Sequence, residues 1–336
     1  MNFRVDRWSA VALRSSLVVL TTVSALLLSS CGGGGQSSQT NRFKPTRMIV
    51  FGDESSLLLP GSTSTAIDGR KYTNNGLSPG TTAIDCNANP IWVQRLAAEY
   101  GLVFAECNPG GATPRVQMRA TAGGKVADVV AAVDAFLAST PGNKPVPTDM
   151  ITMMVGTNDI LELYNSVITS ALTQTAAVAE IQRRAELLAA QINRLTNDRN
   201  TLGRVMYSTV PRVSLTPFGR SQSSGDQTLL RLLTDSFNDR MRSLVRINGR
   251  SLGFLSTAQT FDNIVEDVVN RGGRPNGIIN VSVPVCTVAV LSCDTDTLVS
   301  GGDISNYLWA DDIRFSYAGH IYIGEDAIDL ATSLPW

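Results

Sequence analysis

Two carboxylates and one guanidinium stand in this sequence at places where reactive groups commonly gather. Glu54 follows the apolar run 48–51 and the pair Gly52-Asp53, which is typical of the carboxyl end of a buried strand. Asp311 and Arg314 lie three residues apart near the C-terminus. A carboxylate can act as a nucleophile, a general acid or a general base, whereas arginine keeps its proton and can only bind negative charge.

Alternating strands and helices must position these residues. We predict buried strands at 48–51, 102–105, 150–155, 205–208 and 253–256, and helices at 90–97, 126–137, 175–199, 226–248 and 321–334. This alternation predicts one α/β/α domain with a mostly parallel sheet. In such folds ligands lie beyond the carboxyl ends of the strands, where Glu54 is expected.

Several loops are expected around that edge of the sheet. Residues 57–86 are predicted to form a long loop, in which 68–72 is interpreted as a solvated turn, with a substrate-facing loop as the alternative. Asn89 is predicted to cap the helix that follows it, with proline at the first helical position. The β-branched segment 278–300 is predicted to form a small hairpin insertion. Both Trp92 and Trp309 are expected in the core.

Three motifs resemble those of the GDSL/SGNH hydrolase family. They read Gly-Asp-Glu-Ser at 52–55, Gly-Thr-Asn-Asp at 156–159 and Asp-Asp-Ile-Arg at 311–314. The resemblance covers essentially the whole mature domain. It implies a flavodoxin-like, five-stranded α/β/α sandwich and the hydrolysis of lipid, sugar or small acyl esters. It also implies no metal and no organic cofactor.

The resemblance assigns a role to each motif position. Glu54 takes the place of the nucleophilic serine, Asp311 that of the catalytic aspartate and Arg314 that of the general-base histidine. The backbone N–H of Gly111, in the block 108–113, and the amide of Asn158 take the places of the oxyanion donors. Neutral, fixed donors of this kind suit a developing negative charge.

The two substitutions remove the ordinary chemistry and replace it with a charge pair. Arg314 cannot take a proton from a hydroxyl, and attack by Glu54 on an ester would give an anhydride. The usual acyl-enzyme route is therefore not expected. Because their charges are opposite, we predict that Glu54 and Arg314 form an ion pair across the site.

Other functions remain open at this point. Ser55 or Ser56 could serve as a shifted nucleophile with His320, the only histidine in the chain, as its base. The alternative is that Ser55 caps a turn and His320 is structural. Glu54 and Asp311 could also act as the acid and base of a glycosidase, although Arg314 between them favours two ionised carboxylates. A further hypothesis is a non-catalytic protein that binds a glycan, an acyl group or a protein partner in the remnant cleft.

The N-terminus is typical of a bacterial lipoprotein. A basic region and an apolar run of about 12 residues end just before Cys31, which predicts a signal peptide over 1–30 and lipid on Cys31. An ordinary signal peptide or an anchor helix is the alternative. Residues 31–41 form a Gly/Ser-rich tether, and 42–336 the folded domain. The predicted partner is a membrane of the cell envelope, which the chain contacts through the lipid on Cys31. Gly32 after the cysteine favours the outer membrane.

Composition limits the remaining possibilities. The formal net charge of −1 over 336 residues gives no electrostatic case for nucleic-acid binding. The mature domain contains four cysteines, an even number that suggests two disulfides in an oxidising compartment. Three pairings are possible, and closeness in sequence favours Cys86–Cys107 and Cys286–Cys293. Four buried thiols are the alternative, and a zinc site is disfavoured because there is no Cys-x-x-Cys spacing.

Overall fold

The computed structural model describes residues 43–63, 66–139, 144–197 and 203–333. All of them belong to one compact unit, Arg42–Trp336. The predicted signal peptide, Cys31 and the tether lie outside the described residues. No helix in the described ranges is both long enough and apolar enough to cross a membrane.

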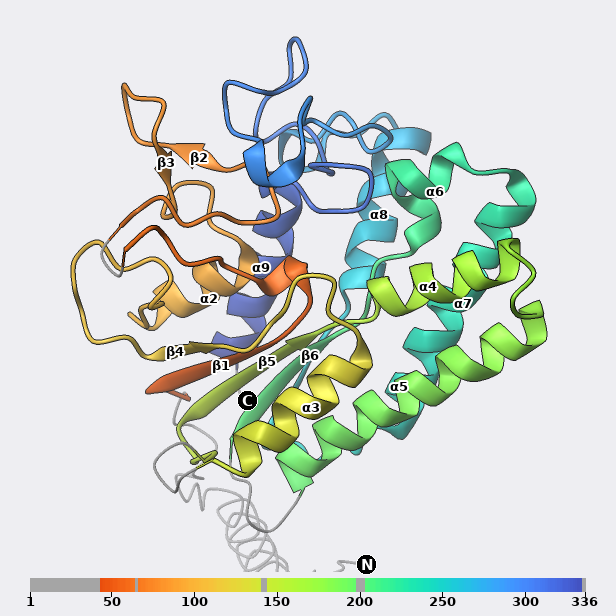
Figure 1. Cartoon of the computed structure of the whole chain (residues 1–336), viewed down its shortest axis with the longest axis horizontal. Coiled ribbons are helices and arrows are strands. Elements are labelled where there is room, and N and C mark those ends of the chain that lie inside the picture. The colour runs from red at the N-terminus through yellow and green to blue at the C-terminus, as the bar shows by residue number, and fades with distance from the viewer. Residues whose placement is uncertain (1–42, 64–65, 140–143, 198–202, 334–336) are drawn as a thin grey trace, which may run out of the picture. The chain divides into compact units, whose positions relative to one another are not determined.

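A five-stranded parallel sheet lies at the centre of the unit (Figure 1). Its strands are β1 (Arg47–Gly52), β4 (Val116–Met118), β5 (Asp149–Met154), β6 (Arg204–Ser208) and β7 (Leu252–Leu255). They are ordered β4-β1-β5-β6-β7, and every pair is parallel. Counted along the chain, this is the order 2-1-3-4-5 of flavodoxin-like folds. The predicted fold class is therefore confirmed.

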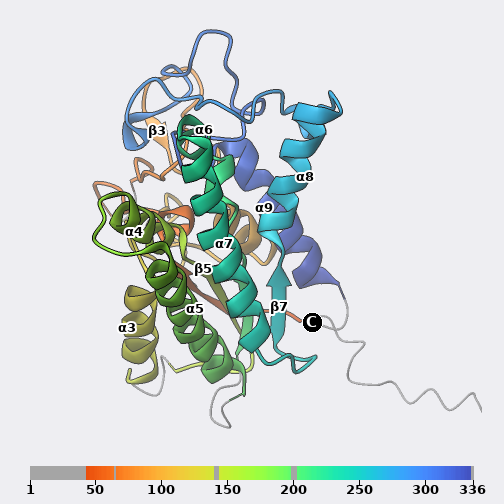
Figure 2. The same ribbon diagram turned by 90° about the vertical axis from the view of Figure 1, so that its right-hand side faces the viewer.

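Helices cover both faces of the sheet, which explains why its strands are continuous apolar runs (Figures 1 and 2). One face carries α2 (Trp92–Glu99), α8 (Thr257–Asn270) and α9 (Tyr317–Thr332). The other carries α3 (Val126–Leu137), α4 (Thr157–Ile168), α5 (Gln174–Asn197) and α7 (Ser224–Leu244). Trp92 and Trp309 are fully buried, as expected.

Three predicted elements differ in the structure. The second strand of the sheet is β4, and not 102–105, because Val116 pairs with Met48 while Phe104 makes only isolated bridges. The helix predicted from residue 90 begins at Trp92. Asn89 does not cap it, since its backbone is left-handed (φ 49°) and its amide donates to the Asn74 carbonyl.

Two helices follow directly on strands and were not predicted. These are α4 after β5 and α8 after β7. A short helix, α6 (Pro217–Ser221), lies between β6 and α7 and was not predicted either. In each case the helix begins at a polar or glycine-containing turn, where apolar periodicity gives no signal for a helix.

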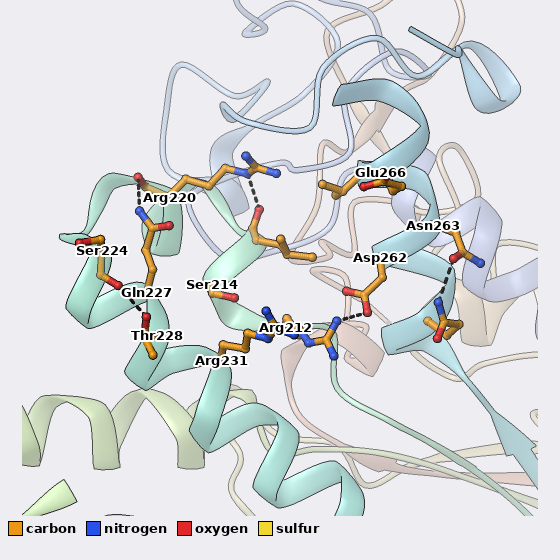
Figure 3. A pocket seen from close by; sticks show the side chains of 13 residues that line it. Arg212, Ser214, Arg220, Ser224, Gln227, Thr228, Arg231, Asp262, Asn263 and Glu266 are labelled. Atoms are coloured by element: carbon orange, nitrogen blue, oxygen red, sulfur yellow. Dashed lines mark hydrogen bonds and ion pairs between the residues drawn. The ribbon is translucent and has the colours of Figure 1, made fainter. Parts of the chain in front are cut away.

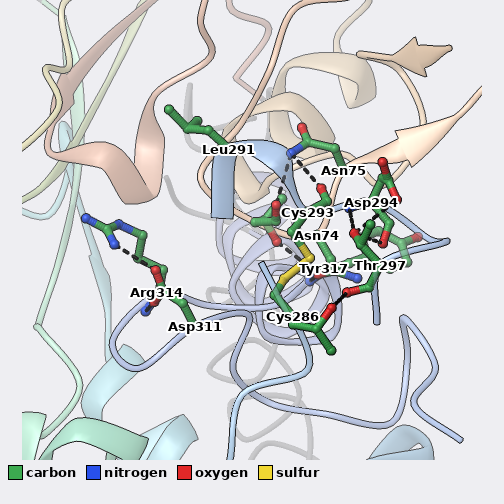
Figure 4. Close-up of a disulfide and its surroundings, with 12 residues drawn as sticks. Asn74, Asn75, Cys286, Leu291, Cys293, Asp294, Thr297, Asp311, Arg314 and Tyr317 are labelled. Atoms are coloured by element: carbon green, nitrogen blue, oxygen red, sulfur yellow. Dashed lines mark hydrogen bonds and ion pairs between the residues drawn. A yellow bond between two sulfur atoms is a disulfide. The ribbon is translucent and has the colours of Figure 1, made fainter. Parts of the chain in front are cut away.

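Both predicted disulfides are present, Cys86–Cys107 and Cys286–Cys293. The second lies in segment 278–300, which is not a regular hairpin (Figure 4). This segment pairs only through isolated bridges, such as Cys286 with Leu298, and contains one short turn of helix, Val290–Ser292. The disulfide thus cross-links a segment whose two arms share a few backbone hydrogen bonds but no regular ladder.

The long loop 57–86 is more ordered than predicted. It contains a two-stranded antiparallel ribbon, β2 (Gly76–Leu77) and β3 (Ile84–Asp85). The turn 68–72 is not solvated at Lys71, which is fully buried. The Lys71 ammonium donates to the carbonyls of Cys86 and Ala88 at 3.0 and 2.6 Å, and burial lowers its pKa to about 7.

Candidate active site

The turn after β1 presents Glu54 at the carboxyl edge of the sheet. Gly52 is required there, because its φ is +150° and a Cβ would lie 2.3 Å from the Met154 carbonyl oxygen. Asp53 then caps the single helical turn η3 (Glu54–Ser56) by accepting a hydrogen bond from the Ser55 N–H. The short turn holds Glu54 in one orientation, with 6% of its side chain exposed.

The carboxylate of Glu54 is held by three groups from three other segments. Its Oε2 accepts hydrogen bonds from the backbone N–H of Gly123 and from the side-chain amide of Asn158, both at 2.9 Å. Its Oε1 lies 3.1 Å from Nη2 of Arg314. The predicted ion pair between Glu54 and Arg314 is therefore present, and both Glu54 oxygens are engaged.

Asp311 holds Arg314 in place. Its Oδ2 accepts from Nη1 of Arg314 at 2.7 Å, as Figure 4 shows, while its Oδ1 accepts two backbone N–H groups at 313 and 314. The guanidinium also lies over the Tyr72 ring, 5.2 Å from its centre. Burial would lower the pKa of Arg314, but Asp311 and Glu54 outweigh burial and raise the pKa above its ordinary value.

The prediction that places Gly111 at this site is wrong, and the glycine whose N–H faces Glu54 is Gly123. Gly111 is exposed, and its N–H donates to the Asn108 carbonyl within a turn. Gly123 lies between β4 and α3, and it is Gly123 that points its N–H at Glu54. The misplaced strand at 102–105 caused this error, because the glycine was sought after the wrong strand. The pair Gly123-Gly124 directly before the helix 126–137 was the signal that could have found it.

Asp159 positions the loop that carries Gly123. Its Oδ2 accepts from the Val126 N–H at the start of α3, and its Oδ1 accepts from Nη1 of Arg184 at 3.1 Å. Asp159 is 1% exposed, and burial raises its pKa. The fourth residue of the Gly-Thr-Asn-Asp motif thus fixes the loop, while Asn158 contacts Glu54 directly. Sequence reasoning gave Asp159 no role.

The site does not bring a shifted serine and histidine together. Ser55 lines the small cavity beside Glu54, whereas Ser56 is fully buried and accepts from the Trp92 indole. His320 is 1% exposed and packs edge-on against Phe315, whose ring lines the cavity. Burial and nearby Lys71 lower the pKa of His320 to about 3. The histidine is therefore a neutral core residue behind Phe315, and its structural interpretation fits the geometry.

Little space remains beside Glu54. The cavity there has a volume of about 10 Å³ and is lined by Ser55, Thr157, Trp309 and Arg314, among others. A cavity of that size holds one water molecule. Neither a sugar ring nor an acyl chain fits in this arrangement. Among the residues that the structure describes, no group of three or more His, Cys, Asp or Glu side chains gathers as metal ligands do.

Asp53 should make the stability of the fold fall as pH rises. Burial, and then the charge of Glu54, raise its pKa from 3.8 to about 7. Between pH 4 and 7 the unfolded chain loses this proton while the folded chain keeps it, so the free energy of unfolding decreases over that range. Asp53→Asn keeps the acceptor for the Ser55 N–H but removes the titration.

We compare the free energy of unfolding of Asp53→Asn with that of the unsubstituted chain. We expect this difference to favour the variant more at pH 8 than at pH 4, by about 1 kcal/mol or more, because only the unsubstituted chain loses stability over that range. Urea unfolding of both proteins at the two pH values measures this difference. An equal difference at pH 4 and pH 8 would show that the folded-state pKa of Asp53 is not raised.

Lipolytic proteins are among the solved structures that this chain resembles. A member of the lipolytic G-D-S-L family from Veillonella parvula is 12% identical, covers 84% of this chain and 97% of its own, and has a TM-score of 0.39. A lipase from a goat rumen metagenome is 13% identical. The match covers 85% of this chain and 98% of the lipase, with a TM-score of 0.44. A phospholipase A1 from Streptomyces albidoflavus is 11% identical. The match covers 86% of this chain and 100% of the phospholipase, with a TM-score of 0.43. The sequence matches no protein-family model and no curated protein. These values record a likeness alone.

Proposed function

We propose that this chain is a non-catalytic member of the SGNH ester hydrolases, whose catalytic position is closed by its own glutamate. One observation carries the proposal. The two donors that would stabilise an ester's oxyanion, Gly123 N–H and Asn158 Nδ2, both donate to Oε2 of Glu54. A permanent carboxylate oxygen thus takes the place of the transient negative charge that an esterase stabilises.

The base position supports the same proposal. Asp311 accepts from Arg314 as it would from a histidine, but a guanidinium has no lone pair with which to take a proton from a nucleophile or from water. Glycoside cleavage by Glu54 and Asp311 is disfavoured as well. Arg314 donates to both carboxylates, so neither is placed to protonate a leaving group.

Ester turnover by the purified chain tests this proposal. We expect no hydrolysis of a short-chain ester such as p-nitrophenyl butyrate above that of Ser55→Ala, because His320, the only histidine in the chain, is buried behind Phe315 and is not placed to activate Ser55. His320→Ala is a second control. Turnover that is lost in both variants would establish a shifted-serine enzyme and overturn the proposal.

We also propose that the chain is held at the bacterial cell envelope, at the outer membrane, by lipid on Cys31. The sequence of residues 1–41 motivates this, and the two disulfides agree with an oxidising compartment. Cys31→Ser removes the acceptor thiol. We expect this variant to move from the membrane fraction to the soluble fraction of the producing bacterium. A variant that stays with the membrane would contradict lipid anchoring at this residue.

A further inference from the structure

A groove outside the Glu54 site is built from two polar helix faces. Its volume is about 590 Å³, within the range of pockets that take small ligands (Figure 3). One wall is the face of α7 that carries Ser224, Gln227, Thr228 and Arg231, spaced i, i+3, i+4 and i+7. The other wall is the face of α8 with the same spacing, from residue 259 to residue 266.

The groove lies at the carboxyl edge of the sheet, beside the last two strands. Its remaining residues come from segment 212–220, which follows β6, and α8 itself follows β7. Ligands of doubly wound folds bind beyond this edge. Val213 and Thr216 of the same segment line the small cavity beside Glu54, so the segment separates the two sites.

Arg220 supplies a cation without a partner acid. Its Nε donates to the Leu215 carbonyl at 3.1 Å, which fixes the guanidinium at the rim of the groove (Figure 3). Among the described residues it forms no ion pair with a carboxylate, and burial lowers its pKa. Arg212, on the same segment, is by contrast paired with both Asp235 and Asp262. Arg220 is therefore the guanidinium that is placed to take an anionic group of a ligand.

The opposite wall offers neutral amides and an acceptor. Gln259 donates to Oδ1 of Asn263 at 2.8 Å, which leaves the amide N–H groups of Asn263 without a protein acceptor in the described part of the chain. Glu266 lies one turn further along α8 and lines the groove too. Amide donors next to a carboxylate acceptor suit hydroxyl groups, which both donate and accept.

The composition of the lining selects among ligand classes. Only Leu215 and Val265 among its 13 residues are apolar, and none is aromatic, which disfavours an acyl chain or an aromatic ring. An extended peptide that binds by adding a strand is disfavoured, because both helical walls have backbone groups that are already paired. A free phosphate would leave most of the groove empty. A hydroxyl-rich chain that carries one carboxylate uses both walls.

We propose that this groove binds a short acidic saccharide, with a sugar carboxylate on Arg220 and sugar hydroxyls on Asn263 and Glu266. The inference goes beyond the proposed function. It does not depend on the loss of hydrolysis, because the groove residues contact neither Glu54 nor its partners in any hydrogen bond or ion pair described above.

Titration calorimetry of the full chain in detergent with tri-galacturonic acid tests the inference, and maltotriose serves as the neutral control. We expect tri-galacturonic acid to bind and maltotriose not to bind. Arg220→Gln should weaken the binding by about tenfold or more, as expected for a charge-assisted hydrogen bond. Asn263→Ala, an exposed substitution that leaves the core intact, should weaken it severalfold.

Arg242→Gln is the matched control, because Arg242 lies on α7 outside the groove, over the Phe254 ring. It removes the same charge and should leave the binding unchanged. Three results would overturn the inference: no binding of tri-galacturonic acid, an equal loss in Arg220→Gln and Arg242→Gln, or equal affinity for tri-glutamate. Equal affinity would identify a site for anions or acidic peptides. Calorimetry reports binding whether or not the chain hydrolyses esters, so failure here is distinguishable from failure of the proposed function.

Discussion

The paired substitution Glu54→Ser and Arg314→His is expected to turn the chain into an ester hydrolase. Serine at position 54 frees the Gly123 N–H and the Asn158 amide, which now donate to Glu54. Histidine at position 314 would have Asp311 to orient it. The imidazole takes the hydroxyl proton, the serine oxygen attacks the carbonyl carbon, and the two freed donors stabilise the oxyanion. The two smaller side chains also enlarge the cavity beside the site.

We expect this double variant to hydrolyse p-nitrophenyl butyrate at least about 100-fold faster than the unsubstituted chain, since a general base and an oxyanion hole each contribute that much or more. Each single variant should stay near the background rate. Adding Asn158→Ala should remove most of the gain, and Glu54→Ala with Arg314→His, which lacks the nucleophile, should show none. A folded double variant without turnover would mean that these positions do not form a hydrolase site.

Removing only one partner of the Glu54–Arg314 pair should strongly destabilise the fold. Glu54→Ala leaves two donors without an acceptor and a partly buried guanidinium with one carboxylate instead of two. Breaking a buried pair in this way costs about 3 kcal/mol or more in the free energy of unfolding. Replacing both partners removes the uncompensated charge. The double variant Glu54→Ala/Arg314→Ala should therefore lose less than the sum of the single losses, by about 1 kcal/mol or more.

The matched control for this cycle is Glu186 and Arg240, an ion pair at 2.6 Å with both side chains 43% exposed. Exposed pairs couple weakly, so this cycle should give well under 1 kcal/mol. Urea unfolding of the unsubstituted chain and the six variants of the two cycles measures both couplings. Additive losses at Glu54 and Arg314 would show that the two side chains do not act as a pair.

The sequence was informative where the chemistry of a residue determines both its environment in the fold and the kind of residue that it contacts. The apolar runs at β1, β5, β6 and β7 gave the sheet, because strands covered on both faces must be apolar throughout. Opposite charges at Glu54 and Arg314, on motif positions that meet in the fold, were enough to predict the ion pair now seen at 3.1 Å. The spacing of the four cysteines in the mature domain likewise favoured the two disulfides.

The sequence was misleading where a tertiary contact overrides a local pattern. Residues 102–105 are as apolar as a strand but make only isolated bridges, so the glycine that donates to Glu54 was expected at Gly111 and is instead Gly123. Lys71 looked like part of a solvated turn, yet its ammonium finds two carbonyls in the interior. The groove between α7 and α8 was not predicted at all. Its two walls are 28 or more residues apart in sequence, the α7 wall looks like an ordinary solvated helix face, and α8 itself was not predicted.

Covalent labelling of the unsubstituted chain with a fluorophosphonate tests the central claim most directly. This probe reacts with a serine that is activated by a general base and lies beside an oxyanion hole. Mass spectrometry locates the modified residue, and Glu54→Ser/Arg314→His is the positive control. Because Oε2 of Glu54 already occupies both donors, we predict no labelled serine in the unsubstituted chain and labelling at position 54 in the control. Stoichiometric labelling of Ser55 in the unsubstituted chain would contradict the claim that its glutamate closes the site.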